Sequence, residues 1–475
     1  MRKFSRFIYA LLVLAVLVVL PVNEAFAAYL YNLRSGVTEE RTRIVLNITD
    51  VPKYKALVSG NKLILNLEGR VSKTTRTLIR GSLVRSATLE PREQNKSRLT
   101  ITFAKTVPSY KVFAVKNPER LVIDFPNTKI GSDKTRPKKK TTFIKLGQGF
   151  TYTASQVNMG AGNVDTYVLE INPGAPYRIN PIPGYGKEIQ KGVLSQISRR
   201  SGAKAVVNAS YFDQDIWVVG NLVIDEKWLG MEDTPRTALV IGKDDKVNIL
   251  PNVAYTGSVQ GAGDSTPITG VNRMRLTDDL IYFNDGYANT TGTNEYGTEV
   301  RIQNGRVLEI SHKGRMPLYS GSIVLSGNGR GEILLKKLRP GDKVTITQDL
   351  GEPLANAAKS VAGAGPLLVY NGRVSVQSTK EEIPSDIASG RSPRTGVGVR
   401  SDGTILIVVA DGRSDASAGM TLNELANYFV RLKAERAMNF DGGGSSEMVV
   451  NGSIMNEPSD GSERPVRVAL GVFAK

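Results

Sequence analysis

One stretch near the C-terminus limits what this chain can fold into more than any other. In residues 437–452 an apolar run ends in Asp441, and three glycines, two serines, a second apolar run and an Asn-Gly pair follow. This pattern predicts two strands joined by a tight loop, with the second strand turning back as a hairpin at Asn451-Gly452. Successive glycines let backbone amides approach a ligand closely, so the loop suits an anion. An ordinary glycine-rich connection is the alternative.

The N-terminus has the layout of a secretory signal peptide. Three basic residues among the first six precede an apolar run over residues 7–20, and Ala25-Phe26-Ala27 provides a small-residue cleavage site. The apolar run is short for a membrane span, and no other stretch of the sequence is long and apolar enough to cross a bilayer. We therefore expect residues 1–27 to be removed from a bacterial protein that is exported and wall-associated or extracellular. An uncleaved anchor is the alternative.

Composition restricts the chemistry. The chain has no cysteine and a single histidine, His312. This excludes thiol nucleophiles, thiolate zinc sites and clusters of histidine ligands, and it disfavours a Ser-His-Asp triad. Acid–base chemistry must then use carboxylates. We expect no required cofactor and no metal site, although a divalent cation held by Asp411 or Asp441 stays open.

The formal net charge of +17 favours polyanionic partners. Export argues against nucleic acid, and the sequence has no basic helix interleaved with aromatic residues that would bind it. The expected partner is a cell-wall polymer, namely peptidoglycan, teichoic acid or exopolysaccharide, acting as substrate or tether. A basic surface that only keeps the protein soluble is the alternative, and the sequence leaves the oligomeric state open.

Residues 28–128 read as strands throughout and contain an internal repeat. The segment 43–67 has a strand, a Val-Pro-x-Tyr turn and two further strands, and the segment 98–125 repeats this order. Alternating apolar positions predict two packed β layers, a small sandwich. The stretch Asn117-Pro-Glu-Arg-Leu-Val-Ile-Asp-Phe125 resembles the AMIN domain of cell-envelope proteins, which implies tethering to peptidoglycan. A sandwich that serves only as a spacer is the alternative.

The basic, turn-rich stretch 129–142 predicts an extended linker, and residues 143–475 form the second domain. In this domain the patterns of strands and helices are mixed. Residues 187–201 carry apolar residues at helical spacing, and Gly202 follows as a C-terminal cap. A capping box formed by Thr421 and Glu424 begins a second helix with a buried apolar stripe.

Polar residues stand where predicted strands begin or end. Asn208, Asp411 and Asp441 each follow an apolar strand. Arg236 and Arg394 each follow a proline and precede an apolar strand, in Thr-Pro-Arg-Thr and Ser-Pro-Arg-Thr. Two such arginines, together with a glycine loop, favour bidentate recognition of phosphate or carboxylate. The sequence does not show which of the two arginines faces the ligand.

Taken together, the motifs of the second domain resemble the NAGPA-type phosphodiester glycosidases and occur in the order of that family from residue 143 onward. They are Asn208-Ala-Ser-Tyr-Phe, Ser392-Pro-Arg-Thr-Gly-Val-Gly, Asp411-Gly-Arg, Gly419-Met-Thr-Leu-Asn-Glu-Leu, Asn439-Phe-Asp-Gly-Gly-Gly-Ser-Ser, Asn451-Gly and Arg464-Pro-Val-Arg-Val-Ala-Leu-Gly-Val-Phe. One departure is Ala209-Ser210, which replaces the paired glycines of the family. We expect this change to narrow the space near Asn208.

The resemblance implies cleavage of the bond between an anomeric carbon and a phosphodiester oxygen, as in an N-acetylglucosamine-1-phosphodiester. A leaving phosphate monoester has a second pKa of about 6 and departs without a strong proton donor. The catalytic carboxylate is expected to be Asp441 first and Asp411 second. The expected substrate- or phosphate-binding residues are Arg394, Arg236, Asn208, Gly442, Gly443, Gly444, Ser445 and Ser446.

These patterns predict an α+β fold, with an N-terminal all-β, sandwich-like module and a mixed α+β phosphodiester glycosidase domain whose helices pack on a largely antiparallel sheet. The expected function is hydrolysis of a glycosyl-phosphodiester bond in a cell-envelope or extracellular polymer. A non-catalytic envelope protein that binds anionic polysaccharide or peptidoglycan is the alternative. A metal-dependent phosphodiesterase is a third candidate, disfavoured by the shortage of histidines.

Overall fold

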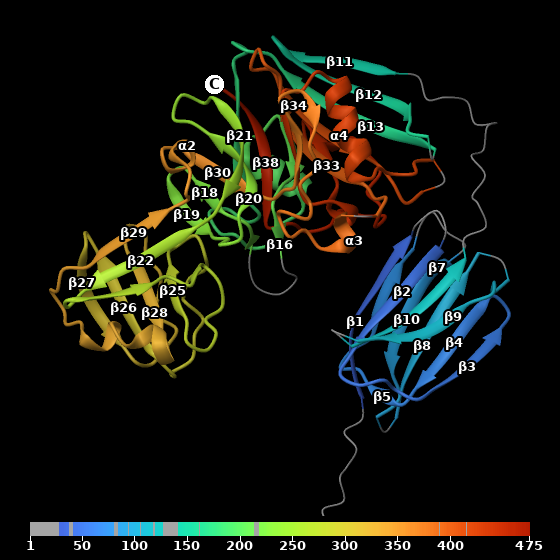
Figure 1. Ribbon diagram of the computed structural model, residues 1–475, viewed down its shortest axis with the longest axis horizontal. Helices are drawn as coiled ribbons and strands as arrows, with labels where there is room; N and C mark the ends of the chain where they lie inside the picture. Colours follow the sequence, from blue (N-terminus) through green and yellow to red (C-terminus); the bar gives the residue numbers. More distant parts are fainter. Residues whose placement is uncertain are drawn as a thin grey trace, which may run out of the picture.

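The computed structural model describes most of the chain (Figure 1). The described residues are 28–37, 41–79, 84–93, 95–104, 106–116, 119–126, 141–160, 162–212, 218–388, 390–414 and 416–475. The predicted signal peptide and residues 129–140 of the predicted linker lie outside this set. Among the described residues, no helix has the length and apolar character needed to span a membrane.

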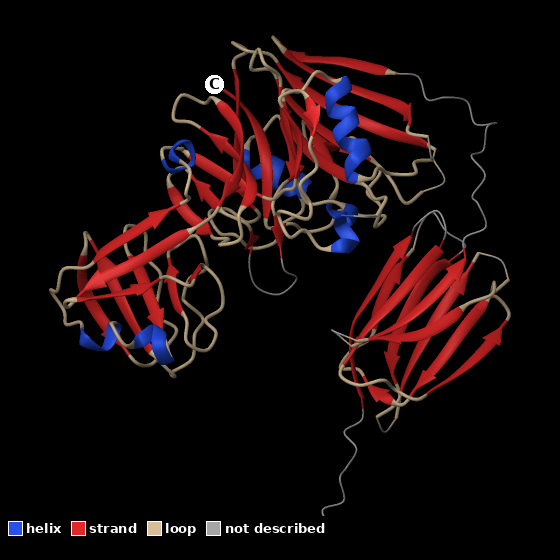
Figure 2. Cartoon of the chain, in the orientation of Figure 1, coloured by secondary structure: helices blue, strands red, loops and turns tan. Residues whose placement is uncertain are grey.

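The predicted α+β class is wrong, because strands make up 50% of the structure and helices 8% (Figure 2). The helix expected over residues 187–201 is reduced to α1, Leu194–Ser201. The residues before it bend instead, and the Gly192 N–H donates to the carbonyl of Val466 at 2.9 Å. The helix expected after Thr421 is present as α4, Leu422–Arg431, with the capping box formed. The remaining helices, α2 (Pro353–Asn356) and α3 (Ser385–Ala388), are single turns.

The N-terminal module consists of two five-stranded sheets in the orders β5-β1-β2-β10-β9 and β3-β4-β8-β7-β6. Their inward-facing apolar side chains, such as Leu46, Leu65, Ile101 and Ile123, form one core, as expected for a sandwich. The strands are β1 Ala28–Val37, β2 Arg41–Ile48, β3 Tyr54–Ser59, β4 Lys62–Leu67, β5 Gly69–Arg70, β6 Thr75–Leu78, β7 Val84–Pro91, β8 Ser97–Phe103, β9 Lys111–Val115 and β10 Arg120–Pro126.

The two copies of the internal repeat exchange strands between these sheets. The first copy supplies β2, β3 and β4, and the second supplies β8, β9 and β10. Strand β2 pairs with β10 of the other copy, and β4 pairs with β8 of the other copy. Each sheet therefore combines one strand of one copy with two strands of the other.

The second part of the chain is organised around an eight-stranded sheet in the order β11-β12-β13-β34-β33-β35-β31-β32. Helix α4 covers one face, where Leu425 and Phe429 pack with Val168, Val408 and Ala437 of the sheet. The strands are β11 Thr142–Gly147, β12 Phe150–Asn158, β13 Asn163–Ile171, β34 Ile405–Ala410, β33 Arg394–Val399, β35 Arg436–Asn439, β31 Leu367–Tyr370 and β32 Arg373–Val374.

The other face of this sheet packs on two further five-stranded sheets, ordered β14-β38-β15-β36-β37 and β19-β18-β30-β20-β21. One apolar core joins all three sheets and includes Ile407, Val207 and Leu239. The strands are β14 Tyr177–Pro183, β38 Val468–Ala474, β15 Ala205–Asn208, β36 Met448–Val450, β37 Ser453–Ile454, β19 Lys227–Gly230, β18 Leu222–Ile224, β30 Ser360–Gly363, β20 Arg236–Ile241 and β21 Val247–Val253. A separate ribbon pairs β16 Tyr211–Phe212 with β17 Val218–Val219. Sheets thus cover this face, whereas α4 covers the opposite one.

Residues 256–349, between β21 and β30, form an inserted β unit, drawn in yellow tones in Figure 1. It consists of a three-stranded sheet, β23-β22-β29, and a five-stranded sheet, β24-β25-β28-β26-β27. The strands are β22 Thr256–Gly261, β23 Asp264–Pro267, β24 Gly270–Val271, β25 Leu280–Phe283, β26 Thr298–Gln303, β27 Arg306–Ser311, β28 Ile323–Gly327 and β29 Thr345–Asp349, with the short 3-10 helices η1 Gly329–Glu332 and η2 Leu335–Lys337.

Candidate functional site

The candidate site lies at one end of the eight-stranded sheet. Strand β33 begins at Arg394 opposite Ala410, the last residue of β34, so that Arg394 and Asp411 lie at the same end. Strand β35 also ends there, because Asn439 pairs with Gly396, and Asp441 follows two residues later. Antiparallel pairing therefore collects three residues that are far apart in the sequence. The structure brings Arg394, Asp411 and Asp441 to one rim.

The glycine loop connects two different sheets, from β35 of the eight-stranded sheet to β36 of a five-stranded one. Asn208, fully buried at the end of β15, ties this connection together. Its amide nitrogen donates to the carbonyl of Asp441 at 2.6 Å, and its amide oxygen accepts from the Thr395 hydroxyl at 2.7 Å and from the Glu447 N–H at 3.3 Å. These contacts hold the loop to β15 and β33, and the substrate-binding role expected for Asn208 stays a prediction.

The three glycines lie beside three different arginines. A Cβ on Gly442 would lie 3.9 Å from Nη1 of Arg394, and one on Gly443 would lie 3.0 Å from Nη2 of Arg413. A Cβ on Gly444 would overlap the guanidinium of Arg464. The backbone also demands glycine at residue 443, whose φ is +63°. The glycine run therefore lets three guanidinium groups approach one short loop.

Two of the three arginines have lowered pKa values. Burial, and to a smaller extent the charge of Arg413, lowers the pKa of Arg394 to about 10. Burial also lowers the pKa of Arg413, and the charge of Arg464 adds to this effect. Two hydrogen bonds from Arg394, from Nε to the Met420 carbonyl and from Nη2 to the Ile387 carbonyl, both 3.0 Å long, fix its guanidinium. Converging like charges of this kind favour an anionic ligand.

Asp441 lies within this group of cations, yet its carboxyl has a raised pKa. Burial raises it to about 6, while Ser445, the charge of Arg464, the Gly442 N–H and the charge of Arg413 oppose the increase. The Gly442 N–H donates to Oδ1 of Asp441 at 2.9 Å. A carboxyl with this pKa is mostly ionised at pH 7 and is protonated in mild acid, which suits a nucleophile or a general base.

Asp411 is held by three donors in a different environment. Its Oδ2 accepts from the Tyr167 hydroxyl at 2.8 Å and from the Glu457 N–H at 3.0 Å, and its Oδ1 accepts from the Asn456 amide at 2.8 Å. Burial raises its pKa to about 6 despite these bonds. Tyr167 also lines a cavity of about 380 Å³ together with Tyr152. The Asn456 amide donates to the Ser446 carbonyl as well, at 3.1 Å, and so joins Asp411 to the glycine loop.

Arg236 pairs with a carboxylate outside the glycine loop. It begins β20, and its Nη1 lies 3.6 Å from Oε2 of Glu232, an ion pair within its own segment. The charge of Arg236 nevertheless acts on Tyr211. Burial and Asp441 raise the pKa of the Tyr211 hydroxyl, whereas Arg394 and Arg236 lower it. Of the two arginines that the sequence singled out, Arg394 is therefore the one beside the glycine loop.

Comparison with known proteins shows what this part of the chain is similar to. Residues 283–473 match the phosphodiester glycosidase family model. The AMIN domain model matches residues 92–148, and this domain is typical of periplasmic and secreted proteins. Arg394, Asp411, Asp441 and the glycine loop all fall within the glycosidase match, whereas Asn208 and Arg236 precede it.

Individual relatives are similar over shorter stretches. An uncharacterized SPbeta prophage-derived protein of Bacillus subtilis, YomE, is 43% identical over 76 residues, which cover 16% of this chain and 12% of that protein. The N-acetylglucosamine-1-phosphodiester alpha-N-acetylglucosaminidase of Mus musculus is 38% identical over 69 residues, 14% of this chain and 13% of that enzyme. The chain thus spans about an eighth of the length of each. A hypothetical protein from Synechocystis shares the fold, with a TM-score of 0.63 and 19% identity over 95% of this chain and 81% of that one.

Several buried polar atoms around the loop have no hydrogen-bond partner among the described residues. They are the hydroxyls of Ser210 and Ser446 and the amide oxygen of Asn439. Burial and the neighbouring Glu463 raise the pKa of Glu447 to about 9. Buried polar groups are normally satisfied, so this concentration of exceptions marks a place where solvent or ligand completes the bonding.

Four residues around the loop were not among the predicted site residues, namely Tyr211, Arg413, Glu447 and Arg464. Arg413 and Arg464 were present in two of the phosphodiester glycosidase motifs but had no role assigned. The available signal was the position of Arg413 directly after Asp411-Gly412 and the position of Arg464 shortly before the last strand. No sequence signal marked Glu447, because the neighbouring residues did not indicate that its carboxyl is buried. Ala209, expected to narrow the site, instead packs its methyl group in the apolar core. No group of three or more potential metal ligands occurs in the described part of the chain.

Proposed function

We propose that this protein hydrolyses the bond between an anomeric carbon and a phosphodiester oxygen in an extracellular or envelope polymer. The observation that carries the proposal is the convergence of Arg394, Arg413 and Arg464 on residues 442–444 beside Asp441. Three guanidiniums and a glycine turn match the charge and the oxygen-rich surface of a phosphodiester. The partial similarity to N-acetylglucosamine-1-phosphodiester alpha-N-acetylglucosaminidase supports N-acetylglucosamine as the sugar to test first.

In this reaction the anomeric C–O bond breaks, and its electron pair leaves with the phosphate oxygen. The arginines stabilise the phosphate monoester as its charge develops, so that no strong proton donor is required. A water oxygen forms the new bond to the anomeric carbon. Asp441 is the carboxylate that stabilises the positive anomeric centre or accepts the proton of that water.

Asp411 stays the second choice for a catalytic carboxylate. All three of its donors come from the protein itself, and Asn456 connects it to the glycine loop. These contacts support a role in positioning the loop and the wall of the adjacent cavity. Under this assignment, Asp411→Asn lowers the rate less than Asp441→Asn does.

We further propose that the AMIN-like module holds the enzyme at the cell wall. The match at residues 92–148 supports this, as does the net charge of +17, which suits anionic wall polymers. In this proposal the substrate is a wall or capsular polymer with sugar–phosphate linkages.

The test is release of N-acetylglucosamine from a synthetic N-acetylglucosamine-1-phosphodiester by the full chain. We expect turnover by the parent, loss by about 10³-fold or more in Asp441→Asn, and a large loss in Arg413→Ala. Arg339→Ala in the inserted unit is the matched control and should retain full activity. Absence of turnover on this and other glycosyl-phosphodiesters, together with tight binding of purified wall polymer, would favour the non-catalytic envelope protein instead.

A further inference from the structure

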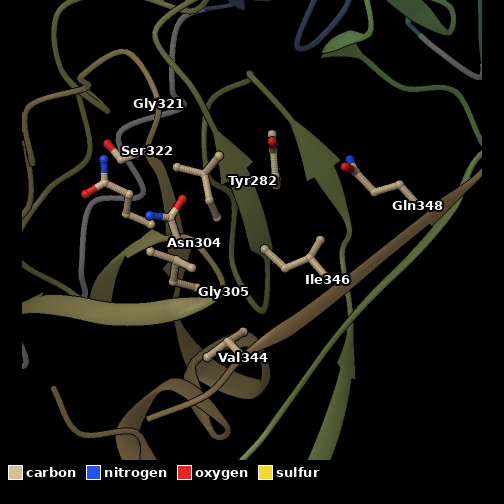
Figure 3. A pocket seen from close by; sticks show the side chains of 11 residues that line it. Tyr282, Asn304, Gly305, Gly321, Ser322, Val344, Ile346 and Gln348 are labelled. Atoms are coloured by element: carbon tan, nitrogen blue, oxygen red, sulfur yellow. The ribbon is translucent and has the colours of Figure 1, made fainter. Parts of the chain in front are cut away.

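A second cavity lies in the inserted β unit, apart from the glycine-loop residues (Figure 3). It has a volume of about 270 Å³ and opens between the five-stranded sheet, which contributes β25, β26 and β28, and the three-stranded sheet, which contributes β29. Asn304 and Gly305 form the turn that follows β26, and Gly321 and Ser322 precede β28. The glycosidase chemistry proposed above makes no use of this cavity.

The cavity has no charged side chain in its lining, although 62 basic and 45 acidic residues occur in the chain. Its polar side chains are instead the amides of Gln303, Asn304 and Gln348 and the hydroxyls of Ser322 and Tyr282. A buried ionic ligand needs an opposite charge, which this lining does not offer. The ligand that fits is therefore neutral.

The polar groups of the lining keep free hydrogen-bonding capacity. In the described residues, the side chains of Gln303 and Asn304 make no hydrogen bond, and Gln348 uses only its amide nitrogen, which donates to the Tyr255 hydroxyl at 3.2 Å. In Figure 3, Asn304 and Ser322 lie on one side of the cavity and Gln348 on the other, with its amide extending toward Tyr282. Amides and hydroxyls both donate and accept, as recognition of several neighbouring hydroxyl groups requires.

The rest of the lining is apolar. Ile302, Ile323, Val344 and Ile346 provide aliphatic surface between the two groups of polar side chains. A pyranose ring presents C–H groups on its faces and hydroxyls around its edge, so one sugar unit matches both kinds of surface. The volume lies at the lower end of ligand cavities, roughly 300 Å³, which suits a single ring rather than a larger ligand.

We propose that this cavity binds one unit of an uncharged saccharide. The inserted unit would thereby hold a neutral segment of a glycan chain independently of the phosphodiester chemistry at the glycine loop. Binding at this site does not require that the protein be a hydrolase, so the two proposals stand or fall separately.

The test is calorimetric titration of the full chain with three neutral probes, N-acetylglucosamine tetramer, cellotetraose and maltotetraose. These probes contain no phosphodiester and are not substrates of the proposed reaction. We expect at least one of them to bind. Gln303→Leu removes an exposed amide and should weaken that binding by about fivefold, the effect of one hydrogen bond. Gln348→Leu provides a second, partly buried amide to test.

The matched control is Gln260→Leu on β22, in the same three-stranded sheet. Gln260 is exposed, pairs with Thr345, and does not line the cavity. It should leave binding unchanged, and thermal unfolding should show that all three variants are folded. Binding of none of the probes, or equal binding by the parent, Gln303→Leu and Gln348→Leu, would overturn the proposal.

Discussion

At the scale of single residues, the site depends on the absence of side chains at three adjacent positions. Residues 442–444 are glycines, and the guanidinium groups of Arg394, Arg413 and Arg464 lie beside them. Asp441 has a raised pKa in spite of these cations because burial outweighs their attraction. The chemistry of the loop thus follows from packing as much as from the identity of its charged residues.

Gly444→Ala tests this arrangement directly. The new methyl group would overlap the Arg464 guanidinium and the Asp460 carboxylate that pairs with it, and both groups lie at the ends of partly exposed side chains that can move away. We therefore expect a stability loss below about 1 kcal/mol. Affinity for methyl phosphate should nevertheless fall by about tenfold, as one charge-assisted hydrogen bond is lost. Gly36→Ala, where a Cβ meets no atom within 4 Å, is the control. Equal phosphate affinity in both variants would contradict the assignment of Arg464.

Glu447 provides a second prediction, on stability against pH. Burial and Glu463 raise its pKa to about 9 in the folded protein, above the ordinary value of 4.5. Between these two values the folded state keeps a proton that the unfolded state has released, so stability falls as pH rises, by at most about 1.4 kcal/mol per pH unit. The pKa of Glu463 is lowered, so its own contribution lies below this window.

Glu447→Gln keeps a donor facing Glu463 and removes the titration. The melting temperature of this variant should exceed that of the parent at pH 8, and the difference should shrink toward pH 5. Glu295→Gln, an exposed position in the inserted unit, should change neither value. Parallel melting profiles of the parent and Glu447→Gln from pH 5 to 8 would show that Glu447 is not protonated in the fold.

At the scale of elements, periodicity located the strands but not their partners. The internal repeat of the N-terminal module was visible in the sequence, yet its copies do not fold as two separate layers. Strand β2 pairs with β10, and β4 pairs with β8, so each copy completes the sheet of the other. Local sequence patterns define strands, whereas pairing depends on which apolar faces meet.

This exchange predicts how the module tolerates truncation. A fragment of residues 28–79 retains β2 and β4 but loses both of their partners from the second copy. We expect residues 28–126 to give the circular dichroism of a folded β protein and a cooperative thermal transition. Residues 28–79 should give neither. A cooperative transition in the shorter fragment would mean that one copy can form a stable layer alone.

The incorrect prediction of a helix over residues 187–201 also concerns the scale of elements. Residues 187–201 have the spacing of an amphipathic helix, but only Leu194–Ser201 adopt it. The hydrogen bonds between Gly192 and Val466, in both directions at 2.9 Å, hold the preceding residues in an extended arrangement. A partner 274 positions away in the sequence overrode the local preference, as tertiary contacts commonly do.

At the scale of the whole molecule, the candidate site is built where sheets meet. The glycine loop leaves one sheet and enters another, and Asn208 from β15 binds both the loop and Thr395 of β33. Asn208 and Tyr211 lie outside the segment that matches the phosphodiester glycosidase family, and the inserted unit separates them from the rest of the site in sequence. Assembly of the site therefore requires the chain on both sides of the insertion.

The sequence by itself determined the glycine loop, the hairpin after it, the capped helix α4 and the polar residues at the strand ends, because each depends on neighbouring residues. The tertiary structure decided the fold class, the pairing of the repeat copies, the positioning role of Asn208 and the choice of Arg394 over Arg236. It also placed Arg413, Arg464 and Glu447 around the loop. These outcomes depend on burial and on contacts between residues distant in sequence, and neither quantity is encoded in a local pattern.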